Sequence, residues 1–556
     1  MSNSAIYFHP DGYVTNRADL KGRHVAGESF LTGFLRHAGS AELVCCAEDE
    51  ELSAGFCELA RRHAPGKPIR LVTQDTLEQL AEPGCLFIPG ANIEQFAWTR
   101  RRVGQRTYSL CGVTHTTAEN PPLCGGLLTG PIQPWDAVIC ASESARSSVE
   151  AVLLPYADYL QHRLGATRLP MPRLPVIPLG IDTAYFRPVS GAREEERAKL
   201  GIGPDDIAVL FVGRLSFHAK AHPIPMYMAL QKAAQKMAQN TGRRLHLIQA
   251  GWFGHENVAL GFAEGAKRYC PDVNVLFVDG RLPDTRQRIW AAGDIFTSLV
   301  DNVQETFGLT PVEAMAAGMP CVISDWNGYR ETVRDGVDGF RVPTLMPPVG
   351  TGWDLADLYA RGREDYDFYI GRTVHMVAVD IDAAAEAYAR LAEDDGLRRS
   401  MGAAAGKRAA EFDWASIIPR YQEVWAELAE LRAREAEIAP WPGHQAMPPQ
   451  SHPLWPDPMA MFAAYPTNQL TGTSRLVRTP EASSQMLADL EVDSLNSLAD
   501  IVISPRRDLE LALQLFAPPV GANVDALLAQ LPAERRLRML RSLVYLVKFG
   551  LLRVVP

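Results

Sequence analysis

Short apolar runs that alternate with amphipathic stretches constrain the fold of this chain more than any other feature. Runs that are apolar along their whole length and separated by helices are typical of parallel strands covered on both faces. The alternation occurs twice, so we expect an α/β fold of two doubly wound domains, with ligands at the carboxyl ends of the strands. The expected strands are 5–10, 41–47, 68–74, 84–90, 109–116 and 137–142 in the first half, and 207–215, 243–252, 273–280 and 295–300 in the second.

The composition is that of a globular protein with more than one domain. The chain has 556 residues, of which 47% are apolar and 22% charged. Its net charge of -10 argues against a nucleic-acid partner. No apolar run approaches the roughly 18 residues of a membrane span, and the N-terminus lacks the pattern of a secretory signal. The nine cysteines include no C-x-x-C pair, which favours a reducing, cytoplasmic location over disulfides or a zinc ribbon.

A connector with prolines at both ends, PVIPLGIDTAYFRP, separates the two alternations. The second alternation ends in a long amphipathic segment, DWASIIPRYQEVWAELAELRAREAE, which a proline-rich stretch follows. Helical patterns return near residue 480. We expect a first Rossmann-like domain, a second one, a crossover helix, a linker and a small helical module, at residues 1–178, 179–412, 413–438, 439–479 and 480–556.

The segment DNVQETFGLTPVEAMAAGMPCVISD, residues 301–325, is the strongest candidate for a ligand site. It predicts a turn, a helix and a strand, which together offer backbone N–H groups and the positive end of a helix dipole to a phosphate. Glu305 precedes the helix and Glu313 lies in its first turn, so both carboxylates can face one ligand. The alternative is structural: Thr310 as N-cap, Pro311 at the first helical position and Glu313 would form a capping box.

Two cations follow the first strand of the second alternation. Arg214 comes directly after Gly213, and Lys220 lies six residues beyond Arg214. At the carboxyl edge of a parallel strand, two such cations can neutralise a diphosphate. The alternative is that both are solvated in an ordinary loop.

The first domain offers three candidate features at strand ends. The expected loop 22–29, which contains Gly27, nearly matches a P-loop, but Glu28 occupies the lysine position and would repel phosphate, so we reject an ATPase. This loop either approaches a sugar or phosphate or caps a helix. His115 follows an apolar strand and either points into a cleft or bonds its own loop. A cluster of arginines either receives an anionic acceptor or forms a solvated face. Its members are Arg100, Arg101, Arg102 and Arg106.

Four stretches together resemble the retaining glycosyltransferases of family 4, or glycosyl transferases group 1. ETFGLTPVEAMAAGMPCV is similar to the E-x7-E signature of that family, VIPLGIDTAYFRP to its interdomain connector, VGRLSFHAK to its Arg and Lys pair, and VICASESARSSVE to the start of its last first-domain helix. The resemblance runs from about residue 5 to 438. It implies the GT-B fold, in which two Rossmann-like domains face each other across a cleft, here with an extra C-terminal helical module.

The resemblance also implies roles for the matching residues. Arg214 and Lys220 would bind the donor diphosphate and stabilise the leaving nucleotide. Glu313 would hold the ribose hydroxyls, and His115 would lie near the anomeric centre. Glu305 and the turn after it would hold the donor sugar and the distal phosphate. That turn consists of Thr306, Phe307, Gly308 and Leu309.

The implied reaction moves a sugar from a UDP- or GDP-linked donor to an unidentified acceptor. Gly27 would line the donor cleft, although its surroundings depart from the paired-glycine form of the family. Members generally need no divalent metal, so we expect neither a metal nor a cofactor. Retention would come from same-face attack, with the leaving phosphate taking the acceptor proton. The implied catalytic residues are His115, Glu305, Arg214 and Lys220.

Two other classes of function stay open. One is a different GT-B enzyme, such as a sugar-phosphate synthase or a phosphorylase. The other is a non-catalytic glycosyltransferase-like scaffold that binds a partner through residues 439–556.

Two segments fall outside the resemblance. Residues 347–375 look like an insertion without an assigned function. The C-terminal module, residues 480–556, ends in a helix that mixes apolar residues with arginines. The pattern predicts a small helical module, winged-helix-like in shape. Its basic face is either solvated or a surface that binds a protein partner or an anionic membrane. A membrane surface would place the chain peripherally on the inner face.

Overall fold

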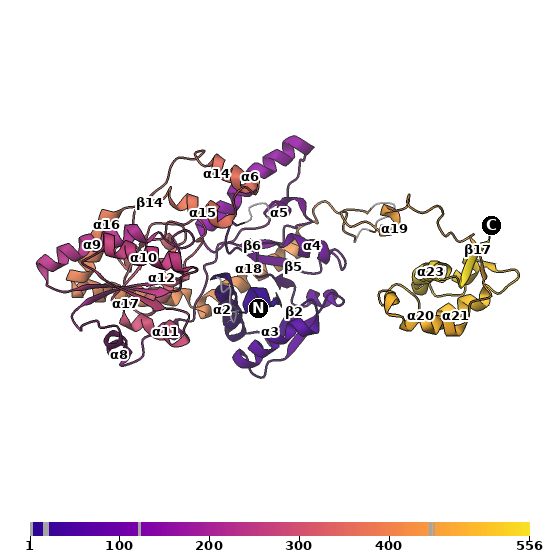
Figure 1. Cartoon of the computed structure of the whole chain (residues 1–556), viewed down its shortest axis with the longest axis horizontal. Helices are drawn as coiled ribbons and strands as arrows, with labels where there is room; N and C mark the ends of the chain where they lie inside the picture. The colour runs from indigo at the N-terminus through magenta and orange to yellow at the C-terminus, as the bar shows by residue number, and fades with distance from the viewer. Residues whose placement is uncertain (1–3, 15–21, 120–123, 444–447, 449–450, 556) are drawn as a thin grey trace. The chain divides into compact units, whose positions relative to one another are not determined.

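The computed structural model describes residues 4–14, 22–119, 124–443, 448 and 451–555 of the chain. Contacts between residues divide the chain into two compact units, one ending at Gly443 apart from the short stretch 448–451, and the other continuing from His452. In Figure 1 the first unit runs from indigo to orange, and the yellow helices and strands belong to the second.

The larger unit contains two six-stranded sheets with equivalent strand orders, β3-β2-β1-β4-β5-β6 and β9-β8-β7-β10-β11-β12. All pairs in both sheets are parallel. Each order reverses direction between its first and fourth strands, which is the Rossmann arrangement. The strands are β1 (Ala5–Tyr7), β2 (Leu43–Cys46), β3 (Ile69–Val72), β4 (Cys85–Phe87), β5 (Ser109–Val113), β6 (Ala137–Ile139), β7 (Ile207–Val212), β8 (Leu245–Gly251), β9 (Asn274–Asp279), β10 (Ile295–Ser298), β11 (Cys321–Ser324) and β12 (Gly339–Val342).

Each sheet has a hydrophobic core on both faces. Successive strand residues point to opposite faces, so Ala5 and Ile6 of β1 belong to different cores. The same holds for Ala208 and Val209 of β7. The expected α/β class of two doubly wound domains is therefore confirmed. The covering helices are α1 (Pro10–Tyr13), α2 (Gly22–His37), α3 (Glu50–His63), α4 (Glu94–Arg100), α5 (Gly126–Thr129), α6 (Glu143–Leu164), α7 (Thr183–Phe186), α8 (Ala192–Lys199), α9 (Pro223–Asn240), α10 (Glu256–Tyr269), α11 (Pro283–Arg288), α12 (Leu309–Ala316), α13 (Tyr329–Thr332), α16 (Ile381–Glu393) and α17 (Asp395–Ala409).

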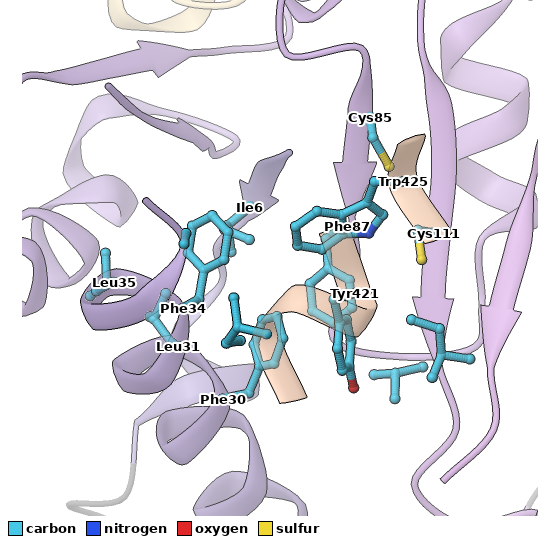
Figure 2. Packing of buried hydrophobic residues seen from close by; sticks show 14 of the residues in the cluster. Ile6, Phe30, Leu31, Phe34, Leu35, Cys85, Phe87, Cys111, Tyr421 and Trp425 are labelled. Carbon is cyan, nitrogen blue, oxygen red and sulfur yellow. The ribbon is translucent and has the colours of Figure 1, made fainter. Parts of the chain in front are cut away.

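Helix α18 (Trp414–Arg434) follows the second domain in the sequence but packs in the core of the first. Figure 2 shows Tyr421 and Trp425 of this helix among Phe30 and Phe34 of α2 and Phe87 of β4. The ring centroids of Phe30 and Tyr421 lie 5.1 Å apart, and those of Phe34 and Trp425 lie 5.9 Å apart. Buried aromatic rings of this kind contribute roughly 2–3 kcal/mol each. The core of the first domain is therefore completed by residues far along the chain.

An insertion interrupts the second domain after β12. A two-stranded antiparallel ladder, β13 (Thr344–Leu345) with β14 (Ala378–Val379), holds its ends together. Between these strands lie helices α14 (Trp353–Ala360) and α15 (Tyr366–Val374). Because the ladder closes at its base, the insertion forms a distinct helical hairpin.

The C-terminal unit is helical with a small sheet. Strand β15 (Arg475–Arg478) pairs antiparallel with β16 (Ala522–Asn523) and β17 (Leu552–Val555). The expected linker 439–479 was therefore wrong about β15, which belongs to this sheet. The helices are α19 (Pro458–Met461), α20 (Ser484–Val492), α21 (Arg506–Leu515), α22 (Val524–Leu528) and α23 (Ala533–Lys548).

Helix α23 is the basic helix that the sequence singled out. Arg535 lies 3.5 Å from the Asp508 carboxylate, Arg536 Nε donates to the Leu531 carbonyl, and Arg538 donates to the Asp500 carbonyl. These arginines therefore bind their own unit in addition to facing solvent. Among the helices that the structure describes, none is both long and apolar enough to cross a membrane.

Candidate functional site

The candidate site lies at the carboxyl ends of β7 and β10, which are neighbours where the strand order reverses. Ile295 of β10 pairs with Val209 of β7. The loop after β7 carries Arg214 and Lys220, and the loop after β10 carries Glu305. Crevices at this position of a doubly wound sheet are where such folds bind ligands.

Lys220 and Glu305 form an ion pair. Lys220 Nζ donates to Glu305 Oε2 at 2.7 Å, and each side chain is 18% exposed. Burial lowers the pKa of the Lys220 ammonium, but the charge and hydrogen bond of Glu305 outweigh burial and hold the pKa well above its ordinary value. Lys220 is therefore a fixed cation held beside Glu305.

The loop after β10 also fixes the position of the Lys220 loop. The His222 backbone N–H donates to Asp301 Oδ1 at 3.1 Å, and the Asn302 side chain donates to the His218 carbonyl. Burial raises the pKa of Asp301 to about 7. Sequence reasoning did not assign Asp301 or Asn302 a role. The available signal was a polar pair directly after an apolar strand.

Arg214 lies in the same loop as Lys220, directly after Gly213. Within the described part of the chain, its guanidinium makes no hydrogen bond and no ion pair. It lines a cavity of about 10 Å³ together with Ser216 and His222. Because an arginine offers five N–H donors in a planar fork, Arg214 can bind a phosphate through two of them.

Helix α12 begins without a side-chain cap. Its N-cap residue is Gly308, with φ 86°, and no side chain accepts from the first turn. The structural alternative, a capping box of Thr310 and Glu313, is therefore wrong, because Thr310 already lies inside the helix. A Cβ on Gly308 would lie 1.8 Å from the ring of Tyr329, so the turn requires glycine. The first N–H groups of α12 therefore lack a side-chain cap from their N-cap residue, and such groups can bind an anion.

Glu313 is a half-buried carboxyl on the first turns of α12. Burial raises its pKa to about 7, although the charges of Lys220 and Arg286 act in the opposite direction. None of the described residues donates a hydrogen bond to its carboxylate. A desolvated carboxylate without a protein donor is typical of a ligand-binding group.

His115 of the first domain lies next to the turn that carries Thr306. Thr306 Oγ1 donates to the His115 carbonyl at 2.6 Å, and Ser142 Oγ donates to the Thr306 carbonyl at 2.7 Å. His115 Nε2 lies 3.1 Å from the Pro89 carbonyl, which can only accept, so Nε2 carries the proton in this bond. The structure thus brings His115 to the site, and Thr306 joins the two domains there.

Gly27 does not lie in a loop, so that prediction was wrong. It lies inside helix α2, which already begins at Gly22. A Cβ on Gly27 would lie 1.9 Å from the Gly12 carbonyl. Close packing of α1 against α2 therefore explains this glycine without any ligand.

The arginine cluster is only partly the solvated face that the sequence offered as one interpretation, because Arg102 and Arg106 are exposed but Arg100 and Arg101 are buried. Arg100 is fully buried and donates to both oxygens of Asp136, at 2.6 and 2.8 Å. Arg106 donates to the carbonyls of Arg432 and Glu435 near the end of α18. Arg101 and Arg106 also lie over tryptophan rings. Most of the cluster therefore stabilises the first domain.

No three histidine, cysteine, aspartate or glutamate side chains in the described ranges are grouped as a metal ion would require. The groups gathered at the site are instead two cations, a helix N-terminus and two carboxylates. Together these suit a ligand that carries both phosphates and hydroxyl groups.

Two Rossmann-like domains with such a site in the second define the GT-B architecture. Residues 192–345 match the family described as Glycosyl transferases group 1. This match falls within the second domain and includes Arg214, Lys220, Glu305 and Glu313.

Curated relatives match part of the chain. The D-inositol 3-phosphate glycosyltransferase of Nocardia farcinica is 29% identical over 271 residues, which cover 48% of this chain and 50% of the relative. The enzyme of the same name from Rhodococcus erythropolis is 30% identical over 174 residues, or 31% of this chain and 37% of the relative. The chain thus spans half or less of the length of these relatives.

Solved structures with a similar fold are distant. Anabaena Alr3699/HepE in complex with UDP has a TM-score of 0.48 and 14% identity, over 76% of this chain and 100% of that chain. A glycosyltransferase from Rickettsia africae ESF-5 has a TM-score of 0.49 and 13% identity, over 77% of this chain and 99% of that chain.

Proposed function

We propose that this chain is a retaining glycosyltransferase that transfers a sugar from a UDP- or GDP-linked donor without a metal. The observation that carries the proposal is the ion pair between Lys220 and Glu305, which lies in a glycosyl transferases group 1 domain. A buried cation beside an uncapped helix N-terminus is suited to a diphosphate. The acceptor is not identified by this site.

Different residues of the second domain bind different parts of the donor. Arg214, Lys220 and the first N–H groups of α12 bind the diphosphate. Glu313 accepts hydrogen bonds from the ribose hydroxyls, which its lack of a protein donor supports. A hydrogen bond that involves a charged group contributes roughly 1.5–3 kcal/mol, so each of these contacts favours donor binding.

Chemistry takes place where the donor sugar meets His115. The bond between the anomeric carbon and the diphosphate oxygen breaks, and the electron pair leaves with the phosphate. Arg214, Lys220 and the α12 dipole stabilise that charge. The acceptor oxygen forms the new bond to the anomeric carbon on the same face, and a phosphate oxygen takes the proton that the acceptor hydroxyl loses. A covalent route would need a free carboxylate nucleophile. Glu305 is instead paired with Lys220, which supports the same-face route.

Nucleotide release from sugar donors tests the proposal. The protein is incubated with UDP-glucose, UDP-N-acetylglucosamine or GDP-mannose, with EDTA or with magnesium, and free nucleoside diphosphate is measured. We expect slow hydrolysis of one donor that EDTA does not inhibit and that Lys220→Ala removes. Failure to bind or hydrolyse any nucleotide would instead favour a scaffold. A requirement for inorganic phosphate without a nucleotide would favour a phosphorylase.

A further inference from the structure

The inserted hairpin of α14 and α15 is anchored in the second domain, close to the site. Ile370 and Val374 of α15 are buried. A Cβ on Gly371 would lie 3.1 Å from His218 Cβ, so α15 packs directly on the loop that carries Lys220. The Asp367 carboxylate lies 3.9 Å from His218 Nε2 on the same side.

The same hairpin also reaches the first domain through two tyrosines. Tyr359 of α14 donates from its hydroxyl to the Glu119 carbonyl. The Tyr366 hydroxyl lies 3.4 Å from Thr116 Oγ1, within hydrogen-bond distance. Both contacts fall on the loop after β5, residues 114–119, which carries His115.

Ring packing within the hairpin fixes the positions of the two tyrosines. The rings of Tyr359 and Tyr369 stack with centroids 4.8 Å apart, and Tyr366 packs beside Tyr359 at 6.3 Å. Burial raises the pKa of Tyr366 to about 12. Rigid aromatic side chains lose little freedom when they make such contacts.

We infer that Tyr359 and Tyr366 are positioning residues, which hold the loop 114–119 so that His115 meets the sugar of a donor bound in the second domain. The inference rests on the proposed function. Thr306 holds the loop from another point, through the His115 carbonyl at 2.6 Å. The hairpin adds two contacts further along the loop, so the second domain holds the His115 loop at three residues.

If the tyrosines only position the loop, their loss affects turnover but not the affinity for the nucleotide. The groups proposed to bind the nucleoside diphosphate all lie in the second domain, so they do not depend on the loop. The reaction at the sugar depends on His115, which lies in the first. Loss of the tyrosine hydroxyls is therefore expected to lower turnover without lowering the affinity for the nucleotide.

The test uses the full chain with Tyr359→Phe, Tyr366→Phe and the double variant. Tyr369→Phe is the matched control, since in the described part of the chain its hydroxyl makes no hydrogen bond. Calorimetry gives the Kd of UDP and of GDP, and product release gives kcat and KM for UDP-glucose and GDP-mannose. We expect the double variant to keep the nucleotide Kd within about twofold and to lose at least about tenfold in kcat, and the control to match the wild type.

A double-mutant cycle shows whether the tyrosines act through His115. In a His115→Ala background, the two Tyr→Phe changes should lower kcat by less than about twofold further. Unchanged kcat in the double variant would overturn the inference. A parallel fall in nucleotide affinity would also overturn it, because the hairpin would then only support the fold.

Hydrogen exchange keeps the inference testable if the proposed function fails. Absence of nucleotide binding and hydrolysis in the wild type would refute the function alone. Exchange of the amides in residues 114–119 should be at least about tenfold faster in the double variant, with other regions unchanged. Equal exchange in wild type and variant would overturn the positioning role independently of any activity.

Discussion

The Lys220 ammonium and the Glu305 carboxylate lie 2.7 Å apart, although 85 residues separate them in the sequence. Neighbouring parallel strands, β7 and β10, bring their loops to one edge of the sheet. Truncating either partner leaves the other charge half-buried and unpaired, which is costly. The pair thus fixes a cation where a diphosphate is expected, and its neighbours give the site its remaining groups.

Substituting Lys220 tests the cation directly. Lys220→Ala should reduce donor turnover at least about 100-fold, since the charge that stabilises the leaving diphosphate is lost. Circular dichroism should stay that of the wild type. Lys236→Ala is the matched control, because Lys236 forms an exposed ion pair with Glu386 at 2.6 Å on the same domain. Wild-type kinetics in Lys220→Ala would refute the assignment.

Glu313 should affect stability and binding in opposite directions. Its pKa is raised by burial to about 7 from an ordinary 4.5, so the folded state loses stability as pH rises from about 4.5 to 7. Glu313→Gln should therefore raise the free energy of unfolding at pH 8, by up to about 3 kcal/mol, and change it little at pH 4.5. At the same time, nucleotide affinity should fall roughly tenfold or more, because the ribose loses a charged acceptor.

Urea unfolding at both pH values, together with nucleotide titrations, checks this prediction. Glu430→Gln serves as the control, since Glu430 is exposed on α18. Equal stabilisation at pH 8 and pH 4.5 would contradict the burial argument. Unchanged nucleotide affinity would remove Glu313 from the site.

The sequence predicted the helix and sheet layers of this fold more fully than it predicted which strands pair with each other. Strands that are apolar throughout must be covered on both faces, which made two doubly wound domains predictable. Pairing of β1 with β4, or of β7 with β10, depends on long-range packing that periodicity does not encode. β15 escaped prediction for the same reason: four residues, RLVR, become a strand only because β16 and β17 lie beside them.

The candidate site was predicted best where its residues are close in sequence. Glu305 and Glu313 flank the start of α12, as the local pattern predicted. The capping box was an alternative that the earlier start of α12 at Leu309 excludes, and the expected Gly27 loop is instead a helix packed closely on Gly12. The burial of Arg100 depends on Asp136, a partner 36 residues away that no local pattern indicates.

Gly308 provides a test of the turn before α12. Gly308→Ala should place a methyl group against the Tyr329 ring and add the strain of a positive φ. Gly336→Ala is the control, because Gly336 has φ 70° but no atom within 4 Å of an added Cβ. Its cost should be about 1–2 kcal/mol, from backbone strain alone. Urea unfolding should show a clearly larger loss for Gly308→Ala, and equal losses would mean that the turn tolerates a side chain.

Truncation tests whether the C-terminal unit is separate. A chain that ends at Gly443 keeps two contacts with the first domain, the Ile438 N–H to Gln133 Oε1 at 2.9 Å and the Trp441 ring under Arg101. It should fold and bind nucleotide like the full chain. A chain that ends at Glu437 loses both contacts and should melt a few degrees lower. If the chain that ends at Gly443 fails to fold, the C-terminal unit is part of the same core.

Calorimetric titration of UDP, GDP, ADP and CMP in EDTA, on wild type and on Arg214→Ala, tests the central claim most directly. The claim is that an unpaired arginine, a fixed lysine and the α12 N-terminus form a metal-independent diphosphate site. We predict one-to-one binding of one nucleoside diphosphate to the wild type, weakened at least about tenfold by Arg214→Ala, since a charged hydrogen-bond donor contributes about 1.5–3 kcal/mol. Absence of binding by every nucleotide, or equal binding by Arg214→Ala, would contradict the account.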